Sequence, residues 1–132
     1  MIRILLDTSA YIASSRVHAA IRSRMEEADE IALSVISLGE LLAGFRKGSA
    51  QRSNEMGLQK FLDSPRIVAV PATTDTAQCY AVIKDSLRKA GAPVSANDLW
   101  IAATAMEHGY RLVTTDADFR KIPQIVVEHH PA

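Results

Sequence analysis

The sequence is poor in cysteine, aromatic residues and net charge, and each shortage excludes something. Cys79 is the only cysteine, so the chain can form neither an intrachain disulfide nor a cysteine-rich zinc site. Aromatic residues make up 5% of the chain, which argues against a base-stacking platform for nucleic acid. The 15 lysines and arginines balance 15 aspartates and glutamates, so long-range attraction cannot draw a polyanion to the protein.

Long apolar runs are also missing. The apolar run at residues 4–6 is too short for the core of a signal peptide. Residues 31–45 form the most apolar long stretch, but Glu40 and several serines interrupt it, so we expect no membrane span. We therefore expect a cytoplasmic protein. Its length predicts one domain over residues 1–132, and 48% hydrophobic content supplies a proper core.

Short apolar runs rich in Ile, Val and Leu predict five strands, at residues 2–6, 31–34, 67–70, 111–114 and 125–127. Because these runs lack strict polar alternation, we expect strands that are covered on both faces. Apolar residues at helical spacing predict intervening helices over residues 17–28, 77–87 and 99–106, the last two closed by Gly91 and Gly109. Residues 47–65 are more polar and predict a loop followed by a short helix at 56–62. Alternating strands and helices indicate an α/β fold with a mostly parallel sheet.

Acidic residues recur at one end of this predicted sheet. Asp7 directly follows the first strand, and Asp116 and Asp118 follow the fourth. Glu40 lies a turn or two into the helix after the second strand, and Asp98 lies near the start of a later helix. Because the carboxyl ends of parallel strands form the binding crevice, we expect these side chains to lie together.

Each acid taken alone could simply cap a helix. Asp7 could cap the helix that follows it, and residues 37–40, 95–98 and 115–118 all match the capping-box pattern. Taken together, ionised carboxylates in one crevice would repel each other unless cations neutralised them. Oxygen-only ligands suit Mg²⁺ or Mn²⁺, and such ions activate water for phosphodiester hydrolysis. The set therefore predicts a metal-dependent nuclease.

Four segments carry a resemblance to a known family: ILLDTSAYI, SVISLGELLAG, SANDLWIAATAMEHG and RLVTTDADF. In this order and spacing, over nearly the whole chain, the sequence resembles the PIN-domain ribonucleases, and among them the VapC-type toxins of toxin–antitoxin pairs. The resemblance implies a three-layer α/β/α sandwich around a parallel five-stranded sheet. It implies catalytic, metal-binding roles for four acids: Asp7, Glu40, Asp98 and Asp116.

The resemblance also implies supporting roles within the same segments. Ser9 would steady the first acid or a metal-bound water, and Thr114 would shape the loop that carries Asp116. Asp116 would be the closer ligand at this loop, with Asp118 either supporting it from behind or serving as the alternate ligand. The implied cofactor is Mg²⁺ or Mn²⁺.

RNA, a small antitoxin and a second copy of the chain are the partners that the resemblance implies. Residues 44–65 are a plausible antitoxin groove because they offer four apolar residues: Phe45, Met56, Leu58 and Phe61. Arg120 follows the acidic loop, and Arg46 and Lys47 follow the Glu40 helix. We expect these three to contact RNA phosphates, which gives affinity without sequence information.

Two other functions fit the same fold. A catalytically silent binding module would act through protein contacts alone, but such a relative should have lost acids, and this chain keeps all four. A DNA-directed nuclease would use the same metal chemistry, so the sequence leaves it open. A receiver-like phosphorylation domain fails, because the third predicted strand is followed by Pro71 where a phosphate-accepting aspartate is required.

Overall fold

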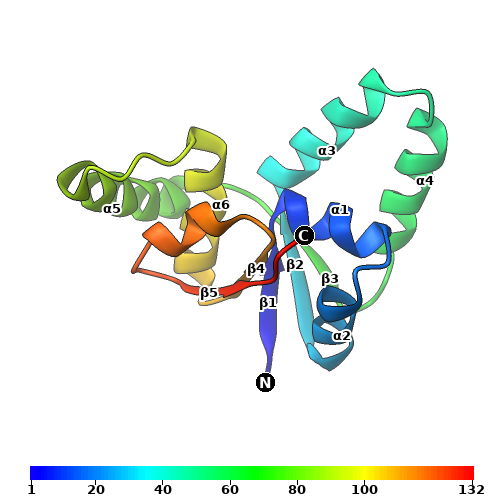
Figure 1. Ribbon diagram of the computed structural model, residues 1–132, viewed down its shortest axis with the longest axis horizontal. Helices are drawn as coiled ribbons and strands as arrows, with labels where there is room; N and C mark the ends of the chain where they lie inside the picture. The colour runs from blue at the N-terminus through cyan, green and yellow to red at the C-terminus, as the bar shows by residue number, and fades with distance from the viewer.

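A computed structural model describes residues 1–132 and shows one five-stranded sheet in which every strand pair is parallel (Figure 1). The strand order is β3-β2-β1-β4-β5. The strands are β1 (Arg3–Leu6), β2 (Glu30–Ser34), β3 (Ile67–Val70), β4 (Arg111–Thr114) and β5 (Val126–His129). All five predicted strands are confirmed, with small shifts at their ends.

Helices cover both faces of the sheet, which confirms the three-layer sandwich. One side carries α1 (Thr8–Ser15), α2 (Ala19–Glu27), α3 (Val35–Lys47) and α4 (Gln51–Leu62) (Figure 1). The other side carries α5 (Thr74–Ala90), α6 (Ala96–His108) and the short 3₁₀ helix η1 (Ala117–Lys121). None of these helices is long and apolar enough to cross a membrane.

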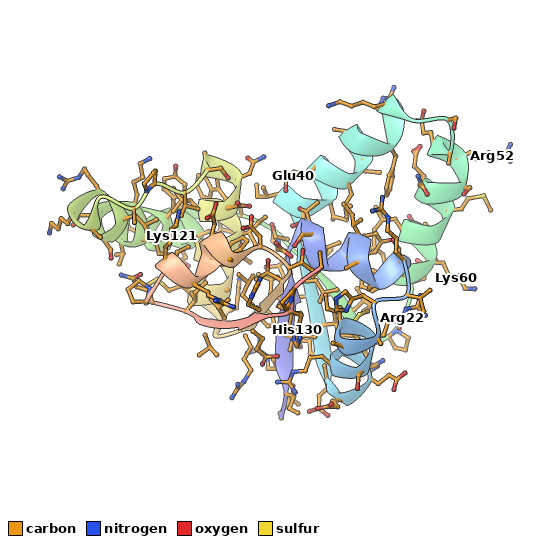
Figure 2. All side chains as sticks on the ribbon, viewed as in Figure 1. Arg22, Glu40, Arg52, Lys60, Lys121 and His130 are labelled. Atoms are coloured by element: carbon orange, nitrogen blue, oxygen red, sulfur yellow. The ribbon has the colours of Figure 1, made fainter.

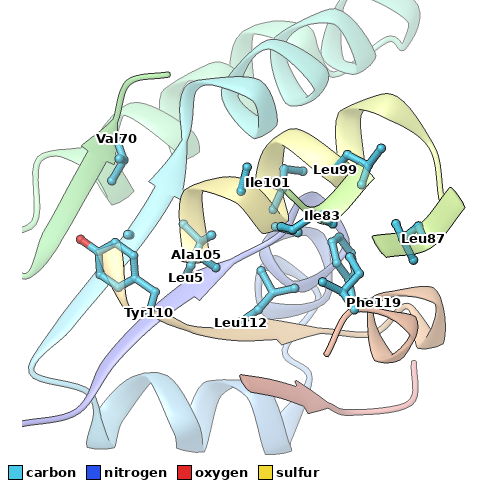
Figure 3. Packing of buried hydrophobic residues seen from close by; sticks show 14 residues of the cluster. Leu5, Val70, Ile83, Leu87, Leu99, Ile101, Ala105, Tyr110, Leu112 and Phe119 are labelled. Atoms are coloured by element: carbon cyan, nitrogen blue, oxygen red, sulfur yellow. The ribbon is translucent and has the colours of Figure 1, made fainter. Parts of the chain in front are cut away.

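The pleat of the strands divides the core into two clusters. Leu5 of β1 packs with Ile83 of α5 and Ile101 of α6 (Figure 3). Ile4 and Leu6, the neighbours of Leu5, belong to the cluster on the opposite face. Successive side chains of a strand point to opposite faces, so a run of apolar residues fills both layers. This explains why the strands show no polar alternation.

The prediction of one helix over 17–28 is wrong at its start. Val17 lies between α1 and α2 with φ +63°, and α2 begins at Ala19, after the His18 side chain caps it. Helix α1, which Asp7 caps, was considered only as a possible helix after that residue, and its bounds were not predicted. Its sequence TSAYIASS is rich in serine, which competes with the backbone for hydrogen bonds and weakens helical patterns.

The predicted loop after residue 47 is also too long. Only residues 48–50 separate α3 from α4, which begins at Gln51 and is a full helix despite its polar sequence. Its buried stripe is narrow, since only Leu58 is fully buried, at 3% exposure. Hydrogen bonds between side chains four apart, Gln51–Glu55 and Gln59–Asp63, stabilise the exposed face.

Both predicted glycine helix ends are confirmed. Gly91 ends α5 with φ +64° and Gly109 ends α6 with φ +70°, a left-handed conformation that only glycine adopts without strain. Cys79 of α5 is half-buried against the core, and burial raises the pKa of its thiol. A raised pKa lowers the fraction of the thiol that is ionised at neutral pH and so lowers its reactivity.

Candidate active site

The acids meet at the carboxyl edge of the sheet, above β1 and β4. Asp7 follows β1 and Asp116 follows β4, and these two strands are neighbours. From β1 the chain proceeds to β2 on one side, while β4 pairs on the other side, so this edge is a topological switch point. Glu40 of α3 lies above the same edge (Figure 2), and Asp98 lies in the first turn of α6.

Asp7 is the most deeply buried acid, at 3% exposure. Its Oδ1 accepts the Ala10 N–H at 2.8 Å, which caps α1, and its Oδ2 accepts the Thr114 hydroxyl at 2.7 Å. The Ser9 hydroxyl lies 2.8 Å from Oδ1. Burial raises the pKa of Asp7, and the negative charge of Asp116 adds to the rise, while the three hydrogen bonds oppose it. The cap role and the site role therefore coincide at this residue.

Two hydroxyl groups connect the loop after β1 to the loop after β4. Thr114 is completely buried, donates to Asp7 and accepts the Asp116 N–H at 2.9 Å. Ser9 accepts the Thr115 N–H at 3.1 Å. The positions of Asp7 and Asp116 are thus fixed relative to one another through side-chain oxygens.

Glu40 is held by two residues that the sequence reasoning missed. The Thr8 hydroxyl donates to Oε1 of Glu40 at 2.6 Å, and the Asn97 amide donates to Oε2 at 3.2 Å. Both residues stand directly beside a predicted acid, Thr8 after Asp7 and Asn97 before Asp98. That adjacency was the available signal, because neighbours in a tight turn or first helical turn reach the same crevice.

Asp98 shows that the four acids share one electrostatic environment. Its pKa is raised to about 6, chiefly by burial and also by the charges of Asp116, Asp7 and Glu40, while a hydrogen bond with Ser95 opposes the rise. The structure therefore brings all four predicted acids together. The clustering of perturbed carboxyl groups at a switch point is typical of a functional site.

The carboxylates are grouped but not closed around one point. As they stand, no three His, Cys, Asp or Glu side chains are near enough to one another to hold a metal ion. Like charges repel, and each carboxylate is directed by hydrogen bonds to its own neighbours. The donor set is nevertheless oxygen-only, which hard divalent ions prefer. An ion bound here would have to draw the carboxylates inward.

Comparison with known proteins adds to this geometry. The family described as PIN domain matches residues 4–125, which is most of the chain. The chain belongs to the PIN-domain family. It is 30% identical over 130 residues to ribonuclease VapC4 of Mycobacterium tuberculosis, covering 95% of each protein.

Solved structures of VapBC complexes have the same fold. VapBC2 from Rickettsia felis, bound to a DNA fragment from its promoter, matches with a TM-score of 0.86 and 27% identity, over 98% of each chain. DNA-bound VapBC from Salmonella typhimurium matches with a TM-score of 0.85 and 28% identity, again over 98% of each chain. The resemblance to VapC-type PIN domains is thereby confirmed.

The fifth predicted acid of this PIN domain, Asp118, is not brought into the cluster. Its side chain is 54% exposed and pairs with Lys121 at 3.2 Å. Its backbone N–H donates to Asp116, which caps η1. The placement of Asp118 gives no support to a direct ligand role, which remains only a prediction from sequence.

The predicted capping boxes have mixed outcomes. Ser95 is the N-cap of α6 and accepts the Asp98 N–H, as the pattern predicted. The box at residues 37–40 is wrong, because Ser34 caps α3 and Ser37 is buried inside it. Asp116, not Thr115, caps η1. Glu40 therefore has no capping role, and its carboxylate can point into the crevice.

The predicted RNA-binding residues differ in their surroundings. Arg46 and Lys47 are exposed in the last turn of α3. Arg120 is exposed and contacts Nδ1 of His129, whose Nε2 lies 3.2 Å from the Thr115 carbonyl oxygen. His129 therefore contacts the segment that carries Asp116, a role that the sequence did not predict.

Proposed function

We propose that the chain is a metal-dependent endoribonuclease, a VapC-like toxin that acts as one PIN nuclease unit over residues 1–132. The observation that carries the proposal is the gathering of Asp7, Glu40, Asp98 and Asp116 in one crevice, where they raise the pKa of Asp98. Relatives at 30% identity bear the name ribonuclease, which supports RNA as the substrate.

The chemistry of the site follows from its acids. Mg²⁺ or Mn²⁺ bound there would polarise water and the phosphate group for in-line attack. Asp7 and Asp116, fixed by Thr114 and Ser9, would hold one side of the ion. Glu40 and Asp98 would hold the other side, and Asp98 must lose its proton to do so. The Thr8 hydroxyl and the Asn97 amide, which donate to Glu40, would keep that carboxylate oriented.

The test compares wild type with Asp98→Asn on total cellular RNA, in Mg²⁺, in Mn²⁺ and in chelator. We expect cleavage by wild type only, and only with metal. Asp118→Asn is the matched control, since it removes an exposed carboxylate outside the cluster and should leave cleavage intact. Equal cleavage by wild type and Asp98→Asn would refute the site.

The same assay separates the alternatives. Cleavage of single-stranded DNA in preference to RNA would make the protein a DNA-directed nuclease. Metal binding by wild type without cleavage of either nucleic acid would favour a catalytically silent binding module. The presence of all four acids in one crevice favours catalysis over such a module.

We further propose that a small antitoxin inhibits the enzyme through a groove between α1, α3 and α4. A cavity of about 400 Å³ lies there, lined by Tyr11, Leu41 and Phe45, and it reaches Glu40. The groove was predicted over residues 44–65, but Leu58 is buried in the core and unavailable, whereas Met56 is 64% exposed. The VapBC complexes with the same fold support a partner of this kind.

The groove can be tested by substitution. Phe45→Glu should weaken inhibition by the cognate antitoxin while RNA cleavage persists, and Met56→Glu outside the cavity should change inhibition less. If inhibition of Phe45→Glu is unchanged, the antitoxin binds elsewhere on the protein. Assembly into a homodimer and location in the cytoplasm stay predictions, and the first is checked by light scattering.

A further inference from the structure

Three arginines lie near the end of α1, and only one of them lacks a partner. The Arg22 side chain donates to the Ser14 carbonyl oxygen at 2.7 Å, and Arg24 forms a two-pronged ion pair with Glu128 at 2.7 Å. Arg16 is exposed, and its guanidinium has no hydrogen bond or ion pair within the chain. Arg16 therefore keeps all its donors for a ligand.

Two cavities flank α1, and Arg16 lines both of them. The first is the groove of about 400 Å³, which contains Thr8 and Glu40. The second, of about 420 Å³, lies on the other side of α1 and contains Ser9 and Thr115. The first cavity thus contains both Arg16 and one of the four acids, Glu40, while the second contains Arg16 and Ser9, whose hydroxyl contacts Asp7. Arg16 is the only lysine or arginine in either lining.

The backbone fixes the position from which the Arg16 side chain extends into the lining of both cavities. Arg16 is the C-cap of α1, and its N–H donates to the carbonyl oxygens of Ile12 and Ala13. The next residue, Val17, is held at φ +63°, a conformation that is unfavourable for a β-branched side chain. His18 then caps α2. Strain of this kind persists where the surrounding structure over-determines a position, often at functional sites.

A positive charge near the crevice would offset the repulsion between the four acids and an RNA backbone. The four clustered acids repel an RNA backbone, and the chain has no net positive charge to compensate. Arg46 and Lys47 lie outside both cavity linings. A strand that lies along the first cavity would contact both Arg16 and Glu40.

We propose that Arg16 binds a backbone phosphate of the RNA substrate at a distance from the cleaved bond, and so positions the strand. The proposal rests on the proposed ribonuclease function. Asp7 and Arg16 bracket the eight residues of α1, about 12 Å of helix at about 1.5 Å per residue. At about 3.4 Å per stacked nucleotide, this span corresponds to about three to four nucleotides. Arg16 is accordingly a positioning residue that touches no reacting atom.

The experiment measures RNA binding without cleavage. Arg16→Gln and the control Arg52→Gln are each made in an Asp98→Asn background, and an end-labelled pool of transfer RNA is titrated in chelator at several salt concentrations. Arg52 is exposed on α4 (Figure 2) and lines a cavity that holds none of the four clustered acids. We expect Arg16→Gln to weaken binding about three- to ten-fold and to lower the salt slope by about 0.7. Arg52→Gln should change neither.

Activity measurements then distinguish a role in positioning the RNA strand from a general loss of catalytic activity. With Asp98 restored, Arg16→Gln should raise KM and leave kcat within about two-fold, and Arg16→Lys should recover part of the binding because it keeps the charge. Equal losses of RNA affinity in Arg16→Gln and Arg52→Gln would refute the proposal. So would an Arg16→Gln variant that binds RNA normally but is inhibited less by the antitoxin. Normal cleavage with no Arg16 effect would overturn this inference and leave the ribonuclease standing. A wild type that neither binds nor cuts RNA would overturn both.

Discussion

Replacing Asp98 by asparagine should stabilise the metal-free protein while abolishing its activity. The ordinary pKa of an aspartate is 3.8, and burial together with three neighbouring acids raises that of Asp98 to about 6. A group whose pKa is higher in the folded state than in the unfolded state binds its proton more tightly when folded. Ionisation of Asp98 therefore opposes folding. The penalty develops between about pH 4 and pH 6 and is complete at neutral pH.

The size of this penalty follows from the same two pKa values. Each pKa unit corresponds to about 1.4 kcal/mol, so the ionised carboxylate destabilises the fold by at most about 3 kcal/mol. Asp98 is partly exposed, and solvent screening reduces this figure. Asparagine also gives up a favourable charge in the first turn of α6, worth about 0.3–1 kcal/mol. The expected net gain is about 1–2 kcal/mol at pH 7.5.

Urea unfolding in chelator, at pH 7.5 and at pH 4, measures this gain. The variant should be more stable at pH 7.5 and nearly equal to wild type at pH 4. Saturating Mg²⁺ or Mn²⁺ should reverse the order by raising the Tm of wild type more than that of the variant. A stability difference that is the same at both pH values would refute the reasoning, because it would not come from ionisation. An unchanged wild-type Tm in saturating metal would refute the metal site.

Three further substitutions test the scaffold. Thr114→Val removes the buried hydroxyl that donates to Asp7 and accepts the Asp116 N–H. It should cost about 1–3 kcal/mol in unfolding free energy and about 10- to 100-fold in RNA cleavage. The control Thr104→Val, buried in α6 and away from the acids, should affect urea unfolding only, and equal losses of activity in the two variants would contradict this. Val17→Gly relieves a left-handed residue and should raise the unfolding free energy by about 0.5–1 kcal/mol; a loss would show that the valine is not strained. Burial raises the pKa of Glu128, but Arg24 outweighs it and holds this pKa below the ordinary value. Arg24→Ala should therefore cost about 2 kcal/mol at neutral pH, and this deficit should shrink in acid as the Glu128 carboxyl becomes protonated. A deficit that does not change with pH would refute the ion pair.

The sequence predicted the sheet well because parallel strands leave a clear local signal. The three central strands, β1, β2 and β4, are buried on both faces and appear as unbroken apolar runs. The edge strands β3 and β5 are partly exposed, yet all five strands were located to within two residues at each end. The glycine ends of α5 and α6 were also predictable, since a left-handed residue limits the choice of amino acid. These features depend on short stretches of chain.

Features that depend on distant contacts were missed. Helix α1 is rich in serine, and its start depends on an Asp7 carboxylate that the completed site also uses. Helix α4 buries little more than Leu58, so its apolar pattern was too weak to show where it begins. The hydrogen bonds from Thr8 and Asn97 to Glu40 join three segments that are far apart in the sequence. Polar pairing of this kind leaves no periodic signal.

The gathering of the four acids could be predicted, whereas their fine geometry could not. Their positions after β1, after β4 and in two helix starts follow from the parallel topology alone. Asp118, two residues further on, lies outside the crevice because η1 directs its side chain toward Lys121. Two residues of a tight turn can thus differ completely in surroundings, which spacing alone does not distinguish.

The same contacts of the acids stabilise the fold and build the candidate active site. Asp7 caps α1, and that cap fixes where α1 begins and therefore where Thr8 and Ser9 point. Thr114 completes the arrangement by satisfying Asp7 and the Asp116 backbone at once. The folded scaffold can in this way hold mutually repelling carboxylates in place before any cation arrives. A cation bound among these acids would relieve the repulsion that remains at Asp98, which is why the wild type should be more stable in saturating metal than in chelator.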